Sequence, residues 1–173
     1  MEIRLGLPRA SGPSATVAGG LTGWRGHTYY RIAGYDRMEP FLTSVVSDSE
    51  LWMYASSRGG LTAGRRDASR SLFPYETVDK LHASQTHTGP TTAVRCERDG
   101  DTWVWEPFGV EGRMRYELER ALYKHALGCE LWFEEHNLTL GLKFRYGWCP
   151  SSRFGWVRTC EIENTAGSAR NLE

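Results

Sequence analysis

Short apolar or aromatic runs recur along most of the chain, and Gly, Pro, Asp and Ser separate the runs. A period of two is typical of strands that bury one face. The clearest run is 138–146, where Leu138, Leu140, Leu142, Phe144 and Tyr146 project to one face, which we expect to be buried or lined with aromatic rings. Similar runs predict strands at 28–32, 41–46, 51–55, 61–63, 91–96, 102–106, 129–134 and 156–163.

Two glycine-containing pairs mark tight turns between these runs. Gly59-Gly60 and Asp99-Gly100 supply the positive φ angles that short hairpins need. Residues 114–123 are ambiguous, because their composition suits a helix while their first half alternates, and we favour a strand. Many short strands, few helix signals and no strand–helix alternation predict an all-β fold, an antiparallel β-sandwich with large sheets packed face to face.

The chain divides into a short lead-in and one domain. Residues 8–26 are rich in Gly, Pro, Ser and Thr, so we expect residues 1–26 to form a loose N-terminal lead-in. Residues 27–173 are enough for a single β-sandwich domain. The strand at 156–163 is followed by a turn and by the start of a new element at 170–173, which predicts a hairpin and a sandwich incomplete at its C-terminus, cut from a larger protein.

Charge and cysteine content narrow the class of protein. Lys plus Arg and Asp plus Glu both number 21, so no global charge favours nucleic acid. No apolar run is long enough to span a membrane or to serve as a signal peptide, and we expect a soluble, cytoplasmic protein with no membrane partner. The spacing of the cysteines fits neither a metal site nor a cofactor site, so we expect small buried residues at Cys96, Cys129, Cys149 and Cys160.

Several segments resemble a known family from about Tyr29 to the last residue. They are residues 41–48, 59–65, 72–80, 103–107, and 153–158 running into Glu163-Asn-Thr165, the last being the most specific. They are similar to the N-terminal galactose-mutarotase-like β-supersandwich region of cellobiose-phosphorylase-like and glucosidase-like enzymes, in which an (α/α)6 barrel follows.

The resemblance implies a function for the whole protein and an accessory role for this chain. The parent would be a glycoside phosphorylase or hydrolase, and its catalytic acid would lie in the missing helical barrel. The partners would then be a carbohydrate and the missing C-terminal catalytic domain or an oligomer partner. No catalytic residue is assigned here; Glu130, Glu134, Glu135, Glu161 and Glu163 are expected on a solvated outer face.

Two groups of residues are candidates for carbohydrate binding. Trp103 and Trp105 share one face of a strand and offer a flat aromatic platform, unless they fill the core between the sheets. Arg65 and Arg66 lie in a Gly-rich loop near Arg58 and Arg70, and their fork-shaped donors suit sugar hydroxyls or phosphate. The alternative for this loop is a solvated turn that pairs with Asp67 and Glu76.

The sequence is also compatible with three other functions. The chain could be a stand-alone carbohydrate-binding module, or a mutarotase-like epimerase with an acid–base pair drawn from His82, His87, His125 and His136. Either one predicts a closed sandwich with a concave polar and aromatic pocket. An accessory domain predicts an exposed apolar surface instead. A purely structural interaction domain would have neither a pocket nor a response to sugars.

Overall fold

The computed structural model describes residues 2–7, 16–73, 75–89 and 91–173, and these form a mostly β structure with antiparallel sheets, as the sequence pattern predicts. Helix within the described residues is confined to four short segments: η1 (Tyr35–Arg37), η2 (Ala68–Arg70), α1 (Val78–Leu81) and α2 (Gly112–Arg115). None of them is long and apolar enough to cross a membrane.

The strands form one large sheet and two small ones. The large sheet has the antiparallel order β12-β11-β10-β9-β3-β2 and consists of β2 (Ala18–Trp24), β3 (His27–Ala33), β9 (Leu118–His125), β10 (Leu131–Asn137), β11 (Leu142–Ser151) and β12 (Gly155–Asn164). The first small sheet contains β4 (Leu42–Val45), β5 (Leu51–Ser56) and β6 (Leu61–Arg65). The second has the order β1-β8-β7-β13 and contains β1 (Ile3–Arg4), β7 (Val94–Arg98), β8 (Asp101–Trp105) and β13 (Asn171–Leu172).

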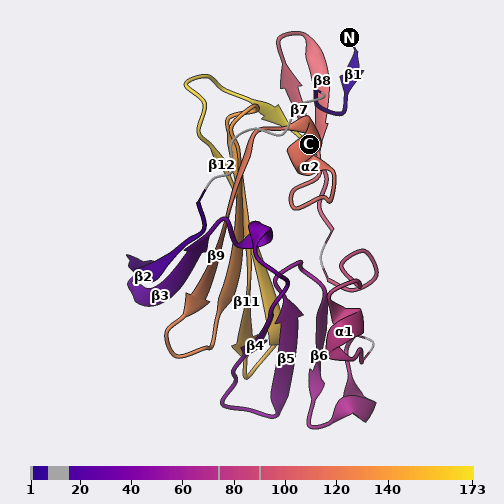
Figure 1. Cartoon of the computed structure of the whole chain (residues 1–173), viewed down its shortest axis with the longest axis vertical. Helices are drawn as coiled ribbons and strands as arrows, with labels where there is room; N and C mark the ends of the chain where they lie inside the picture. Colours follow the sequence, from indigo (N-terminus) through magenta and orange to yellow (C-terminus); the bar gives the residue numbers. More distant parts are fainter. Residues whose placement is uncertain (1, 8–15, 74, 90) are drawn as a thin grey trace.

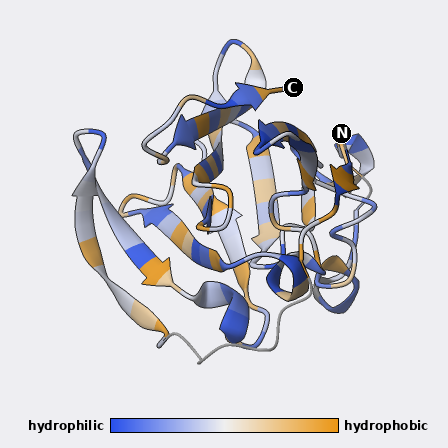
Figure 2. Ribbon diagram, turned by 90° about the horizontal axis from the view of Figure 1, so that it is seen from above, coloured by the Kyte–Doolittle hydropathy of each residue, from blue (hydrophilic) through white to orange (hydrophobic). Residues whose placement is uncertain are grey.

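Both small sheets pack against the same face of the large sheet, one towards each end of the molecule (Figure 1). One apolar core contains buried side chains from all three sheets, for example Met53, Trp105 and Phe133. On β11 the alternate residues Leu142, Phe144, Tyr146 and Trp148 are buried, which is the period of two expected of a half-buried strand. Bands of hydrophobic and hydrophilic residues along the strands are visible in Figure 2.

The structure corrects the predicted start of this strand. Leu138, which is 40% exposed, and the buried Leu140 lie in the turn before β11, although the alternating pattern includes them. The turn ends at Gly141, whose φ of 67° lies in the left-handed region that favours glycine. The hairpin turns at Gly59-Gly60 and Asp99-Gly100 are confirmed, between β5 and β6 and between β7 and β8.

Residues 18–24 lie in the expected loose lead-in, but the structure places them in β2. This strand pairs along its whole length with β3 through a turn at Arg25 and Gly26, whose φ angles are 54° and 78°. Most β2 side chains are exposed, so backbone hydrogen bonds rather than apolar burial hold the strand. The expected boundary at residue 27 therefore falls within a hairpin, while residues 8–15 lie outside the described part of the chain.

Three further expectations need correction. Residues 112–115 form α2, so only the later part of the ambiguous 114–123 segment is strand. The predicted hairpin after residue 163 is wrong, because β13 pairs with β7 in a different sheet. Of the cysteines, all of them free, Cys96 is buried but Cys160 is exposed.

The outer face of the large sheet carries a second, smaller aromatic cluster of Trp24, Tyr29, Tyr123 and Trp132. The Arg25 guanidinium lies 4.5 Å from the ring centroid of Trp24 and 4.3 Å from that of Trp132, and it also forms an ion pair with Glu161 on β12. These contacts connect the β2–β3 turn to β12, the strand at the opposite edge of the large sheet.

Candidate functional site

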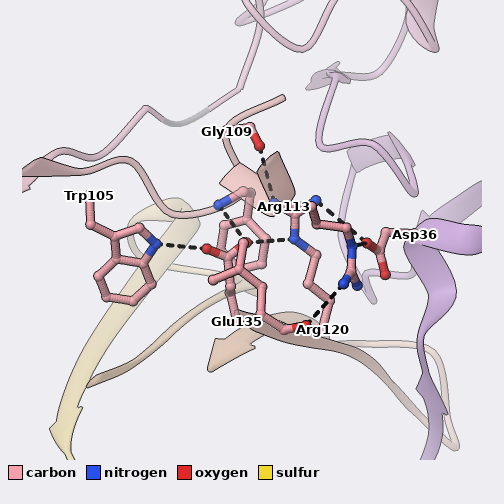
Figure 3. Close-up of polar contacts among 8 residues, drawn as sticks. Asp36, Trp105, Gly109, Arg113, Arg120 and Glu135 are labelled. Carbon is pink, nitrogen blue, oxygen red and sulfur yellow. Dashed lines mark hydrogen bonds and ion pairs between the residues drawn. The ribbon is translucent and has the colours of Figure 1, made fainter. Parts of the chain in front are cut away.

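Glu135 is a charged residue on the core face of β10. Its position follows Leu131 and Phe133 at a period of two, and its side chain is 0% exposed. The Trp105 indole N–H donates to its Oε1 at 2.8 Å, and the Phe108 backbone N–H donates to its Oε2 at 3.0 Å (Figure 3). A buried carboxylate needs such donors, because it has lost its hydration.

Arg120 supplies the countercharge from the neighbouring strand. It lies directly opposite Glu135 in the β9–β10 register, and its Nε donates to Glu135 Oε2 at 2.5 Å. Its Nη2 donates to the Gly109 carbonyl at 3.1 Å, and its Nη1 lies 3.6 Å from Asp36 Oδ2. Arg113 completes the chain of contacts, because its Nε donates to the same Asp36 oxygen at 2.5 Å (Figure 3). The network joins the large sheet to η1, α2 and the 106–110 loop.

Asp36 keeps one carboxylate oxygen without a partner. Among the described residues, no group hydrogen-bonds its buried Oδ1. Burial alone would raise the pKa of Asp36, but the hydrogen bond from Arg113 and the charge of Arg120 outweigh it, and the pKa is lowered. Asp36 is therefore an ionised acceptor at neutral pH.

This lowered pKa leads to an expected pH dependence of folding. The contribution of Asp36 to stability is complete above the ordinary aspartate pKa of about 3.9 and is lost as the pH falls through the lower folded-state value. We expect the urea midpoint of the wild-type protein to fall between pH 6 and pH 3 by more than that of Asp36→Asn, measured by tryptophan fluorescence. Equal decreases in the two proteins would contradict this assignment.

Phe108 is held in a strained backbone conformation beside this network. Its φ of 64° is in the left-handed region, which is unfavourable for a non-glycine residue. The hydrogen bond to Glu135 compensates, and the Phe108 ring packs edge-on against Tyr146 with centroids 5.2 Å apart. The buried network thus determines where the Phe108 ring lies.

Two adjoining cavities of about 250 and 320 Å³ lie at Phe108, and we refer to them together as the groove. Both are lined by Arg58, Gln85, Phe108 and Val110. The first adds Thr86, Thr91, Glu106 and Tyr146, and the second adds Tyr35, Asp36 and Arg120. The groove therefore combines aromatic rings with hydroxyl, amide, carboxylate and guanidinium groups.

Local sequence explains how Arg58 and Gln85 come to the groove. Arg58 lies in the β5–β6 turn, where Gly59 has a φ of 98°. Gly60 allows the 81–85 segment to approach the turn, because a Cβ at this position would lie 2.4 Å from the Leu81 carbonyl oxygen. A contact of 2.8 Å between Ser56 Oγ and His82 Nδ1 ties the same segment to β5. Arg58 is exposed, and its guanidinium has no partner among the described residues.

The structure does not bring the tryptophan and arginine candidates from the sequence together. Trp103 and Trp105 are buried in β8, so neither ring forms an open platform, and Trp105 supports the groove only through Glu135. Arg65 and Arg66 lie where β6 ends, at the other end of the molecule from β8 (Figure 1). Arg66 pairs with Glu50, at 2.5 Å, rather than with Asp67 or Glu76.

Asp36, Gln85, Arg120 and Glu135 are not among the site residues expected from the sequence, and Glu135 was expected on a solvated face. No clear signal marks Glu135 in the sequence, because Leu131, Trp132 and Phe133 form a continuous apolar run and both Glu134 and Glu135 follow it. The histidines do not form a site with these residues: none lines the groove, and His125 and His136 contact Cys129 and Thr165 instead.

Comparison with known proteins adds no family assignment. No protein-family model matches this chain, and no curated protein sequence matches it.

Proposed function

We propose that this chain is a carbohydrate-binding β-sandwich that serves as the accessory N-terminal part of a glycoside phosphorylase or hydrolase, and that the groove is its sugar site. The resemblance of segments 41–48, 59–65 and 153–165 to the supersandwich region of such enzymes supports the enzyme context. The groove supports the binding role independently, because its residues are those that a sugar ring requires.

The chemistry of the groove matches a pyranose. A sugar presents an apolar C–H face and a ring of hydroxyls that both donate and accept hydrogen bonds. The Phe108 ring offers an apolar surface, while Arg58 can donate to sugar oxygens and Gln85 can both donate and accept. Asp36 and Arg120 line the second cavity, where their ion pair helps to hold its wall in place.

One observation carries this proposal: a buried ionic network holds the groove in place, while the Arg58 guanidinium at the groove has no partner among the described residues. A preorganised site does not spend binding energy on ordering its own residues. The groove lining contains no histidine, so the epimerase alternative has no support at this site. A concave polar and aromatic groove is the feature expected of a stand-alone binding module, so it is the resemblance in sequence that favours an accessory domain over that alternative.

Isothermal titration with glucose, galactose, cellobiose and maltose tests the proposal. We expect one of these sugars to bind, and Arg58→Ala to weaken its binding about tenfold, which corresponds to the loss of one charge-assisted hydrogen bond of roughly 1.4 kcal/mol. Arg66→Ala is the matched control, because this exposed arginine lies outside the groove lining. Absence of binding by all four sugars, or equal weakening by both substitutions, would contradict the proposal.

A further inference from the structure

The edge of the large sheet at β2 has the features of an interface. Among the described residues, β2 pairs only with β3, and none of these residues pairs with the backbone N–H and C=O groups on its other side. Unpaired strand edges of this kind favour pairing with another chain, and natural proteins usually protect them with charges, prolines or bulges.

The two edge strands of the large sheet differ in whether charged residues protect them from pairing with another chain. The sequence of β2, Ala-Gly-Gly-Leu-Thr-Gly-Trp, contains no charged residue and no proline. The opposite edge strand, β12, carries Arg158, Glu161 and Glu163. The β2 edge therefore lacks the charged residues that would oppose strand pairing, whereas β12 has them.

Exposed apolar side chains lie next to the β2 edge. Leu21 on β2 and Tyr30 on β3 face each other in the register, and they are 74% and 46% exposed. Both side chains lie on the core face of the large sheet. Paired residues of neighbouring strands point to the same face, and Tyr30 pairs with Lys124, which in turn pairs with the fully buried Leu131. The β2–β3 hairpin lies away from both small sheets, so neither of these sheets covers this part of the face (Figure 1).

We propose that a second copy of this chain covers this edge by pairing its own β2 antiparallel to the first. Antiparallel pairing of a strand with itself is self-complementary, as a two-fold dimer requires. Leu21 is the fourth of the seven residues of β2, so the two Leu21 side chains meet near the dyad, with a Tyr30 beside each. The uncharged strand and the formal net charge of zero remove electrostatic opposition to self-association.

The dimer is compatible with an open groove. No groove-lining residue belongs to β2 or β3, so the pairing leaves Arg58 and Gln85 accessible. The large sheets of the two copies would then form one continuous sheet. This proposal is independent of the sugar proposal, because it concerns a different edge and a different partner.

Sedimentation equilibrium of the wild-type chain and two leucine-to-lysine variants tests the dimer. We expect the wild type to have twice the mass of the chain, and Leu21→Lys to have the mass of one chain, because it places like charges opposite each other at the dyad. Leu127→Lys is the matched control, since Leu127 is 81% exposed and lies in the β9–β10 turn, and we expect it to remain a dimer.

Both variant positions are exposed, so circular dichroism spectra like that of the wild type are expected for both. A monomeric wild type would overturn the proposal. So would a Leu21→Lys variant that stays dimeric, or a Leu127→Lys variant that dissociates to the same extent.

Discussion

Replacing Glu135 by alanine is expected to lower the free energy of unfolding by about 3–5 kcal/mol, the usual cost of removing one partner from a buried ion pair. The substitution leaves the Arg120 guanidinium, the Trp105 indole N–H and the Phe108 backbone N–H without their carboxylate acceptor in the core. Urea unfolding, followed by tryptophan fluorescence and circular dichroism, measures the loss.

A double variant separates the ion pair from simple loss of packing. Glu135→Leu with Arg120→Met replaces both charges by apolar groups, and we expect it to unfold at a higher urea concentration than Glu135→Ala. If Glu135→Ala costs less than about 1 kcal/mol, or if the double variant is the less stable of the two, the carboxylate does not hold the groove.

Gly60→Ala is expected to lower stability by about 2–3 kcal/mol and to weaken sugar binding as well. A Cβ here would lie 2.4 Å from the Leu81 carbonyl oxygen and 2.7 Å from Ser84 Oγ, so the 81–85 segment must move away from the β5–β6 turn. Gln85 would move with it and leave its place in the groove lining. Urea unfolding and sugar titration of the same sample measure the two effects.

Gly167→Ala is the matched control, because a Cβ at this position meets no atom within 4 Å and its φ is not positive. We expect its stability to stay close to that of the wild type. A Gly60→Ala protein with unchanged stability would contradict the close approach of the 81–85 segment to the turn. A destabilised variant with unchanged sugar affinity would show that Gln85 does not take part in binding.

Much of the fold could be predicted because the information is local. The alternation in β11 and the Gly59-Gly60 and Asp99-Gly100 turns are encoded within a few consecutive residues. The errors concern elements held by distant partners. Strand β2 consists largely of exposed residues and depends on backbone pairing with β3, and β13 pairs with β7 far along the chain. No local pattern contains those pairings.

The groove was harder to predict for the same reason. Asp36, Arg58, Gln85, Phe108 and Arg120 come from segments widely separated in the sequence, and packing of the small sheets on the large one brings them together. The rings of the β8 tryptophans have a chemistry that suits sugars, but their side chains face the core.

Amide chemical-shift mapping can show whether the groove at Phe108 binds a carbohydrate. An isotope-labelled sample is titrated with the sugar that binds best, and the shifted amide signals are assigned to residues. We expect shift changes concentrated at Arg58, Gln85, Phe108 and Val110, with none at Arg65 or Arg66. Shifts that cluster at the arginine loop, or no shifts with any of the sugars, would contradict this expectation.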